Sequence, residues 1–365
     1  MSRQQSTMCK GMAILIMFFH HLFYDLNFWT QYDVIADPFT NKQLASLASV
    51  GKICVAVFVF LSGYGTARSF HERSIGNPKQ IGENTISRLV KIMMHYWYIY
   101  IVAFFVALFA GTTSIPELYN SGDRNHWLKN MLVDFLGMPL LTQTPTLCTT
   151  WWYMSYAVML IVVLPVVISI VKKYGAIVSL GGVIIILPFM GITGDTAFGH
   201  WMLSAVLGVV CADYNIFEYL NRKLSGHRLY IALILNLVLI AIFALGRIKI
   251  REYVIIDATM ALLCCFFVIF GLSKIKLIKD ILLIYGRHEF TIFLTHTFIR
   301  KYYFADFTYS WKYPIVMWIM LAITSLLLAM VLDWGEKLVK FDKLTRYVQN
   351  KCIKMHNEMW RAKEV

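Results

Sequence analysis

Residues 10–21 read Lys-Gly-Met-Ala-Ile-Leu-Ile-Met-Phe-Phe-His-His, an apolar run that opens with a cation and closes with two imidazoles. In an α-helix Lys10 and His21 are about 1100° apart around the axis, roughly 20° past three full turns, so they lie on the same face. His21 then lies about 16 Å deeper than Lys10 in a hydrocarbon layer about 30 Å thick. An ionisable group at that depth is costly and by default marks a functional site.

The composition of the whole chain is that of a membrane protein. Of 365 residues, 58% are hydrophobic and only 15% are charged, which excludes an ordinary soluble domain. The formal net charge is +13, and in a membrane protein such charge collects in cytoplasmic loops, so we expect no nucleic-acid partner. The seven cysteines show neither CxxC nor metal-ligand spacing. We therefore expect no metal site and no permanently bound cofactor.

The apolar runs predict an all-α, polytopic transmembrane bundle of about ten spans. They cover residues 11–28, 52–70, 91–111, 151–171, 176–192, 199–213, 229–246, 253–272, 281–300 and 314–333. Basic residues collect in alternate connections, roughly 23 against about nine, which predicts that both termini are cytoplasmic. The expected organisation is a transmembrane domain over 1–335 and a basic tail over 336–365, held near membrane lipids. This organisation predicts a multi-pass protein of the cell (cytoplasmic) membrane.

Two segments on the predicted outer side have unusual patterns. The long connection 112–150 contains residues 131–141, which we expect to form a short amphipathic helix on the outer surface. Arg247, Lys249 and Arg251 are an exception to the distribution of basic residues, because they fall in a short outer loop. They form a candidate acceptor-binding patch.

The first predicted helix carries the strongest candidate for chemistry. Asp25 lies one turn beyond His21 on the same face, where a carboxylate can orient a catalytic imidazole and stabilise its protonated form. His20 lies 100° away and is expected to face another helix. A histidine that only bridges two helices is the simpler reading, but the aligned Lys10 and Asp25 favour a functional role.

Further candidates lie in other predicted spans and loops. Arg88 and Lys91 are three residues apart and share a helical face, with Arg68 on the same predicted side, so the three could bind phosphates. Loop anchoring is the plainer explanation for each of them. Trp151 is expected in an interfacial aromatic belt, whereas Trp152 suits either a belt or a sugar-binding face.

The predicted span 281–300 carries a third polar group. Its His296 is expected at a height within about 6 Å of His21. Arg287 and Glu289 are expected to pair with other buried charges, and Asp257 is one option. The alternative is a structural polar seam between helices.

Together these motifs resemble those of the bacterial acyltransferase family 3 integral membrane proteins. Lys10 with His21 resembles the family's Arg/Lys-x10-His signature, and Phe58–Tyr64 resembles its Phe-Phe-Leu-Ser-Gly-Phe/Tyr run. Arg88–Ile92 is similar to the Arg-x-x-Arg-Ile sequence that enters the family's third helix. Trp152–Met154 resembles the Trp-Phe/Tyr-Leu opening of its fourth helix, and Ile292–His296 resembles its Ile-Tyr-Leu-x-His motif, so the motifs follow in the same order. There are two departures. Gly286-Arg287-His288-Glu289 stands where the family often has Gly-Lys-Asn-Ser. Lys91 replaces the second Arg, which makes phosphate contacts less bidentate.

The resemblance implies an O-acyltransferase that moves an acyl group, usually acetyl, from a cytoplasmic donor to a hydroxyl of an extracytoplasmic sugar. The donor would be an acyl-CoA such as acetyl-CoA, and the acceptor a polysaccharide or a lipid-linked sugar. We expect His21 to act either as general base or as covalent acyl carrier. The assignments to be tested are catalytic residues His21, Asp25 and His296, donor-binding residues Lys10, Arg68, Arg88 and Lys91, and acceptor-binding residues Trp152, Arg287 and Glu289.

Two other functions compete with this one. In a proton-coupled transporter or flippase, His21, Asp25, Glu289 and Asp257 would form a proton relay. Against it, the two halves of the chain show no matched pair of Gly/Pro-broken helices. A glycan polymerase would use Arg247 and Arg251 instead.

Overall fold

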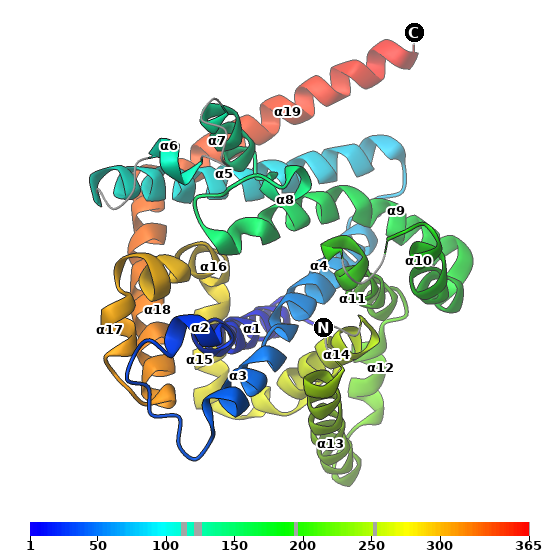
Figure 1. Ribbon diagram of the computed structural model, residues 1–365. Helices are drawn as coiled ribbons and strands as arrows, with labels where there is room; N and C mark the ends of the chain where they lie inside the picture. The colour runs from blue at the N-terminus through cyan, green and yellow to red at the C-terminus, as the bar shows by residue number, and fades with distance from the viewer. Residues whose placement is uncertain (111–114, 120–125, 193–195, 251–253, 365) are drawn as a thin grey trace. The chain divides into compact units, whose positions relative to one another are not determined.

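The computed structural model describes residues 1–110, 115–119, 126–192, 196–250 and 254–364, which form helices and no strands (Figure 1). In this described part, seven helical stretches are long and apolar enough to cross a membrane, or eight if the bent pair of α11 (Ala197–Asp213) and α12 (Ile216–Lys223) counts as one span. The predicted spans number about ten. The difference arises because 151–171 and 176–192 fall in one stretch, Thr149–Phe189, and because 281–300 is broken. The predicted span 199–213 counts only together with the helix that follows it.

The chain divides into two compact units, Met1–Arg73 with Val166–Leu327, and Ser74–Pro165 with Leu328–Val365. The helices of the first unit are α1 (Arg3–Phe23), α2 (Leu26–Trp29), α3 (Asn41–Val50), α4 (Ile53–Glu72), α10 (Leu187–Phe189), α11 (Ala197–Asp213), α12 (Ile216–Lys223), α13 (His227–Lys249), α14 (Val254–Phe270), α15 (Lys276–Arg287), α16 (Glu289–Thr297) and α17 (Ala305–Tyr309). Those of the second are α5 (Pro78–Ala110), α6 (Ile115–Leu118), α7 (Trp127–Phe135), α8 (Pro139–Thr142) and α19 (Phe341–Glu364). Both units contain part of α9 (Trp152–Gly181) and part of α18 (Pro314–Leu338).

The first helix begins and ends earlier than its apolar run suggested. Ser2 and Gln5 form a capping box, in which the Gln5 backbone N–H donates to Ser2 Oγ at 3.2 Å and the Ser2 N–H donates to Gln5 Oε1 at 2.8 Å. This cap starts α1 at Arg3 rather than at residue 11, and α1 ends at Phe23 rather than at 28. Lys10 therefore lies inside the helix and not at its entrance.

Two glycines bring α1 into backbone contact with α15. A Cβ on Gly286 would lie 1.9 Å from the Thr7 carbonyl oxygen, and a Cβ on Gly11 would lie 2.0 Å from the Leu282 carbonyl oxygen. Small residues allow such close helix packing in membranes, where van der Waals contact replaces the hydrophobic drive. The contact sets the position of the helix that follows, α16, beside α1.

Helical geometry is interrupted within the predicted span 281–300 and between two other predicted spans. His288 (φ −103°, ψ 11°) separates α15 from α16, and a π-helical segment, Phe298–Tyr303, follows α16. The predicted span 281–300 is therefore three pieces. Gly175 (φ 79°, ψ 177°) interrupts α9 between the predicted spans 151–171 and 176–192, as their boundaries predicted. The predicted boundaries at 111 and 253 lie outside the described residues.

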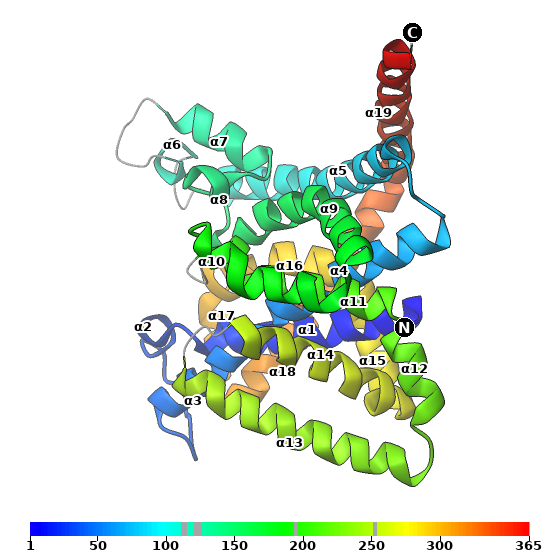
Figure 2. The ribbon, with the colours of Figure 1, turned by 90° about the vertical axis from the view of Figure 1, so that its right-hand side faces the viewer.

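In the first unit, α13 runs alongside α14 (Figure 2). Only 6% of the most apolar window of α13 is buried, so this helix presents most of its apolar surface outward, as a lipid-facing helix does.

The second unit is built on the 33-residue helix α5. The tail helix α19 packs on α5, where Gln349 Nε2 donates to the Ser87 carbonyl oxygen at 2.8 Å. Because α5 begins at Pro78 and not at residue 91, Arg88 and Lys91 lie within it. The amphipathic segment predicted over 131–141 is divided between α7 and α8.

One buried carboxylate holds the loops of the second unit. Asp134 is completely buried and accepts hydrogen bonds from the Tyr119 hydroxyl at 2.7 Å, the Thr146 hydroxyl at 2.8 Å and the Leu147 N–H at 2.7 Å. Burial raises the pKa of the Asp134 carboxyl, and these donors oppose that effect. The sequence alone did not single out this residue.

Candidate active site

His21 of α1 and His296 of α16 face each other, with ring centroids 5.1 Å apart. His296 is completely buried, whereas His21 is half-buried. His20 continues the row, with its ring centroid 5.0 Å from that of His21. The expectation that His21 and His296 lie at similar depth is confirmed, and their chemical roles stay predictions.

The hydrogen bonds of the two outer imidazoles fix where their protons lie. His296 Nδ1 lies 3.1 Å from the Ile292 carbonyl oxygen and 2.9 Å from that of Phe293, and His20 Nδ1 lies 2.9 Å from the Ala48 carbonyl oxygen. Because carbonyl oxygens only accept, each Nδ1 carries a proton and donates it. His296 Nε2 is then left to accept the Thr297 hydroxyl at 3.2 Å.

His21 differs from its two neighbours. Among the residues that the structure describes, none forms a hydrogen bond with the His21 ring. Both nitrogens of His21 therefore lack a protein partner among these residues, whereas each neighbouring ring has its Nδ1 bound to a carbonyl oxygen. His20, by contrast, is fixed to α3 through Ala48, as expected for a residue that faces another helix.

A second contact between α1 and α16 lies on the same faces as the imidazole pair. Lys10 Nζ forms an ion pair with Glu289 Oε1. Glu289 and His296 are seven residues apart, close to two full turns, so one face of α16 meets the face of α1 that holds Lys10 and His21. Phe18 lies on this face too, with its ring 6.1 Å from that of His296. The predicted alignment of Lys10 with His21 is thereby confirmed.

The expectation for Asp25 is wrong in its geometry. Asp25 follows the C-cap residue Tyr24 and precedes α2 as an exposed residue. Among the described residues, the structure gives it no orienting contact with the His21 ring.

Two further expectations about charged partners are also corrected. Arg287 is exposed at the end of α15 rather than buried. Asp257 does not pair with Arg287 or Glu289, because it accepts from Arg247 Nε at 2.6 Å and lies 2.8 Å from His200 Nε2. This cluster is fully enclosed, with Asp257 at 0% and Arg247 at 4% exposure.

The same cluster overturns the proposed outer basic patch. Arg247 belongs to the last turn of α13 and points into the first unit, where its Nη1 donates to the Ser49 carbonyl oxygen at 3.1 Å. The buried Asp257 carboxylate at the start of α14 accounts for this orientation. Lys249 is exposed, and Arg251 lies outside the described residues.

The comparison with family models decides the class of this protein. A model described as an acyltransferase domain, that of acyltransferase family 3, matches residues 6–334. The chain belongs to acyltransferase family 3. No curated protein and no solved structure matches it. Together with its apolar helices, the family makes this chain a multi-pass membrane acyltransferase.

The four expected donor-binding cations of this family 3 acyltransferase fall in different units. Lys10 and Arg68 belong to the first unit, and Arg88 and Lys91 to the second. Arg68 Nη1 donates to Asn215 Oδ1 at 2.8 Å and lies 3.9 Å from Glu218 Oε1. Arg88 is half-buried and Lys91 is exposed.

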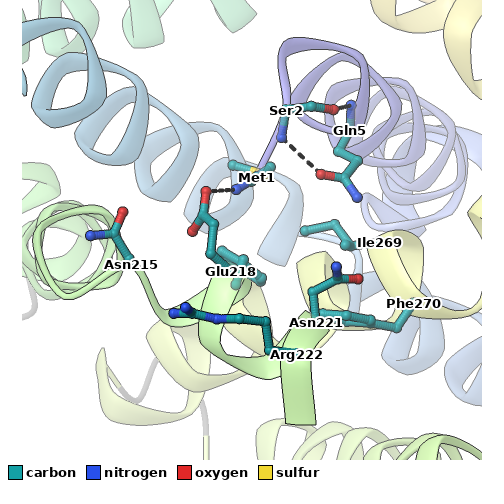
Figure 3. Close-up of a pocket in the computed structure, with 10 residues that line it drawn as sticks. Met1, Ser2, Gln5, Asn215, Glu218, Asn221, Arg222, Ile269 and Phe270 are labelled. Atoms are coloured by element: carbon teal, nitrogen blue, oxygen red, sulfur yellow. Dashed lines mark hydrogen bonds and ion pairs between the residues drawn. The ribbon is translucent and has the colours of Figure 1, made fainter. Parts of the chain in front are cut away.

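A pocket lies at the start of α1 (Figure 3). The pocket has a volume of about 550 Å³ and is lined by the first residues of the chain and by residues of α12 and α14: Met1, Ser2, Gln5, Asn215, Phe217, Glu218, Asn221, Arg222, Ile269 and Phe270. Asn215 and Glu218, two of the residues that Arg68 contacts, are among them. The pocket therefore brings polar, charged and apolar groups together near the start of α1.

The two tryptophans at the start of α9 differ in burial. Trp151 is completely buried between the rings of Tyr96 (centroid 5.2 Å) and Tyr100 (5.8 Å). The belt expectation for Trp151 is therefore wrong, because the segment that follows α8 turns this residue into the second unit. Trp152 is half-buried, and its role in acceptor binding stays a prediction.

Two features of the acyltransferase went unnoticed in the sequence. Arg300 is buried four residues after His296, a spacing that could have drawn attention to it. His95, Asp333 and Glu336 of the second unit come together with ligand atoms within 4.8 Å of one another, a set of the kind that binds divalent metals. His95 is far in sequence from Asp333 and Glu336, so spacing alone gave no signal.

Proposed function

We propose that this protein is a membrane O-acyltransferase, most specifically an O-acetyltransferase, that uses acyl-CoA from the cytoplasmic side. Its acceptor is a hydroxyl of an extracytoplasmic polysaccharide or of a lipid-linked sugar. The observation that carries the proposal is the His21–His296 pair in a chain of acyltransferase family 3, with His21 on the same face of α1 as Lys10.

The donor side of the proposal starts from the charges of coenzyme A. Its phosphates need several cations, and Lys10 and Arg68 supply two of them in the first unit. The Lys10 side chain is 36% exposed, so a phosphate can reach it although Glu289 is its present partner. Arg68 donates to Asn215, which lines the pocket at the start of α1 (Figure 3). Arg88 and Lys91 are the further donor-binding candidates on α5.

The chemistry is assigned to His21. As general base, His21 takes the proton of the acceptor hydroxyl while the hydroxyl oxygen bonds to the thioester carbonyl carbon. The C–S bond then breaks, and the coenzyme A sulfur leaves with that proton. As acyl carrier, a His21 nitrogen instead bonds to the thioester carbonyl carbon, and the C–S bond breaks so that coenzyme A leaves as the thiolate. The acceptor hydroxyl oxygen then bonds to the acyl carbon, the N–C bond to His21 breaks, and the hydroxyl proton goes to the thiolate. His296, with its Nδ1–H fixed to two carbonyls, positions the acceptor or polarises the carbonyl.

Aromatic side chains beyond His21 support a sugar acceptor. Tyr32 and Tyr309 stack with ring centroids 4.6 Å apart and an interplanar angle of 11°. Phe28 packs on Tyr309 at 5.7 Å. Tyr309 is buried beneath these two rings, whereas Phe28 and Tyr32 are half-buried and follow His21 closely in the chain. Accessible aromatic faces of this kind suit a carbohydrate ring. Trp152, Arg287 and Glu289 stay as the acceptor-binding candidates predicted from sequence.

The test uses radiolabelled acetyl-CoA and membrane vesicles that contain the protein and the native surface glycans. We expect release of free coenzyme A thiol and transfer of label to the glycan. His21→Ala should abolish both, whereas His227→Ala, at an exposed histidine that starts α13, should leave both intact. Movement of unmodified glycan across the vesicle membrane, without thiol release, would instead establish the transporter.

A further inference from the structure

Arg300 is a buried cation beside the imidazole row. It is 6% exposed and lies in the π-helical segment Phe298–Tyr303 that follows α16. Its charge interacts electrostatically with His21 and with His296. Its guanidinium carbon lies 5.7 Å from the centre of the Phe28 ring. Arg300 therefore belongs to the same site as the two histidines.

The Arg300 guanidinium keeps at least one N–H donor without a hydrogen-bond partner among the described residues. Among the described residues, no carboxylate forms an ion pair with Arg300, and its buried Nε–H has no hydrogen-bond partner. Its polar neighbour is the hydroxyl of Tyr309, which is itself held by donation to the Leu22 carbonyl oxygen at 3.0 Å. A buried, permanently charged side chain without a counter-ion is costly, and such groups persist where a function requires them.

Arg247, another buried arginine of the first unit, differs from Arg300 in its partners. Arg247 is 4% exposed, as deeply buried as Arg300, yet it forms two hydrogen bonds to Asp257 and one to Ser49. Arg247 has the contacts of a structural residue. Arg300 lacks the carboxylate but lies beside the histidines, in a rare helical geometry that is frequent at functional sites.

We propose that Arg300 binds the negatively charged oxygen that forms on the acyl carbonyl during transfer. This assignment rests on the proposed acyltransferase function and adds a catalytic residue to it. When an acceptor oxygen or a His21 nitrogen bonds to the carbonyl carbon, the π electron pair of the C=O bond moves onto its oxygen. Arg300 N–H groups donate to that oxyanion. The pair then returns to re-form C=O as the C–S bond breaks, and the sulfur leaves with the electrons of that bond.

The assignment holds for both roles of His21. A tetrahedral oxyanion forms whether His21 activates the acceptor or carries the acyl group itself, so the same donor serves either path. A donor fixed in a site that excludes water stabilises the transition state more than it stabilises the bound substrate. The expected signature is therefore a loss of turnover without a loss of donor affinity.

The experiment compares Arg300→Gln with Lys301→Gln in the full-length protein. Lys301 is the next residue, its Nζ lies 5.3 Å from the centre of the same Phe28 ring, and it is half-buried, so it is a matched loss of one charge. Turnover of acetyl-CoA is followed by thiol release in glycan-containing vesicles. Affinity is measured with a thioether analogue of acetyl-CoA that cannot be cleaved. Arg300→Gln should lower turnover about 10²–10³-fold with unchanged analogue affinity, and Lys301→Gln should change turnover less than about threefold.

The outcomes separate this inference from the proposed function. If the unaltered protein releases no thiol from acetyl-CoA, propionyl-CoA or succinyl-CoA, the proposed function fails. If it does release thiol and Arg300→Gln retains its turnover, or loses affinity for the analogue in proportion, the oxyanion role is refuted. Should Arg300→Gln fail to fold, Arg300→Lys decides, because it keeps the charge but loses the forked donors. It should fold and retain part of the turnover, and full turnover in Arg300→Lys would also refute the role.

Discussion

Lys10 and Glu289 form an ion pair between the same faces of α1 and α16 that bring His21 and His296 together. The two contacts fix the register of α16 against α1 at both ends of the shared face. A shift of one residue in either helix would turn its side chains by about 100° and separate both pairs at once. The imidazole pair is thus held by a charge pair on the side of α1 where donor binding is proposed.

The ion pair predicts opposite effects of its two members on donor affinity. Lys10→Gln should raise the KM for acetyl-CoA about tenfold, the equivalent of about 1.4 kcal/mol, because a phosphate contact is lost. Glu289→Gln should lower the KM, because it frees Lys10 from its competing partner. Steady-state thiol release at varied acetyl-CoA measures both. Equal increases in KM for the two variants would indicate a purely structural pair.

The hydrogen bonds of His296 predict which amide can replace it. The side-chain amide of Asn at this position can replace Nδ1, which donates only to carbonyl oxygens of α16. The longer side chain of Gln instead places its amide near the position of Nε2. His296→Gln should therefore retain more turnover than His296→Asn, which should lose about 10²-fold or more. Label transfer to glycan is the readout. Equal activity of the two variants would argue that only the packing of the ring matters.

The close approach of α1 and α15 predicts a large effect of one methyl group. Gly286→Ala places a Cβ against the Thr7 carbonyl oxygen, so the two helices must separate, and both thermal stability and turnover should fall. Gly65→Ala is the control, because a Cβ there meets nothing within 4 Å and α4 gains about 1 kcal/mol of helix propensity. Thermal unfolding in detergent compares the two. A Gly286→Ala variant as stable as the control would show that this contact does not position α16.

The buried Arg247–Asp257 pair predicts a loss of stability rather than of acceptor binding. Arg247→Met leaves the Asp257 carboxylate uncompensated and should cost about 3–5 kcal/mol, whereas the exposed Lys249→Met should cost little. The double variant Arg247→Met with Asp257→Leu should recover most of that loss. Thermal unfolding checks the order of the three. If Arg247→Met keeps its stability and changes only the acceptor dependence, the interpretation as a structural pair is wrong.

Helical spacing was enough to predict the central contact of the site. The Lys10-x10-His21 spacing placed both residues on one face, and counting along 281–300 placed His296 at the depth of His21. Such predictions succeed because the α-helix has a fixed rise and rotation per residue. The family followed from the same motifs and their order, and the family model confirms it.

Predictions failed where a local signal or a distant partner overrode periodicity. The capping box at Ser2 starts α1 at Arg3, and Asp25 lies exposed beyond the last residue of the helix, Phe23. Arg247 turned inward because of Asp257, a partner in the next helix that loop charge counting cannot reveal. Arg300 escaped notice because its meaning depends on which groups surround it in three dimensions.

Adjacent histidines offer the most direct measurement, since His20 and His21 differ in environment but not in chemistry. His20→Asn keeps a donor for the Ala48 carbonyl oxygen, and we predict thiol release from acetyl-CoA within a few fold of the unaltered protein. His21→Asn should lose at least about 10²-fold, because the imidazole that serves as base or acyl carrier is gone. Turnover retained by His21→Asn, at a level equal to that of His20→Asn, would contradict the assignment of acyl transfer to His21.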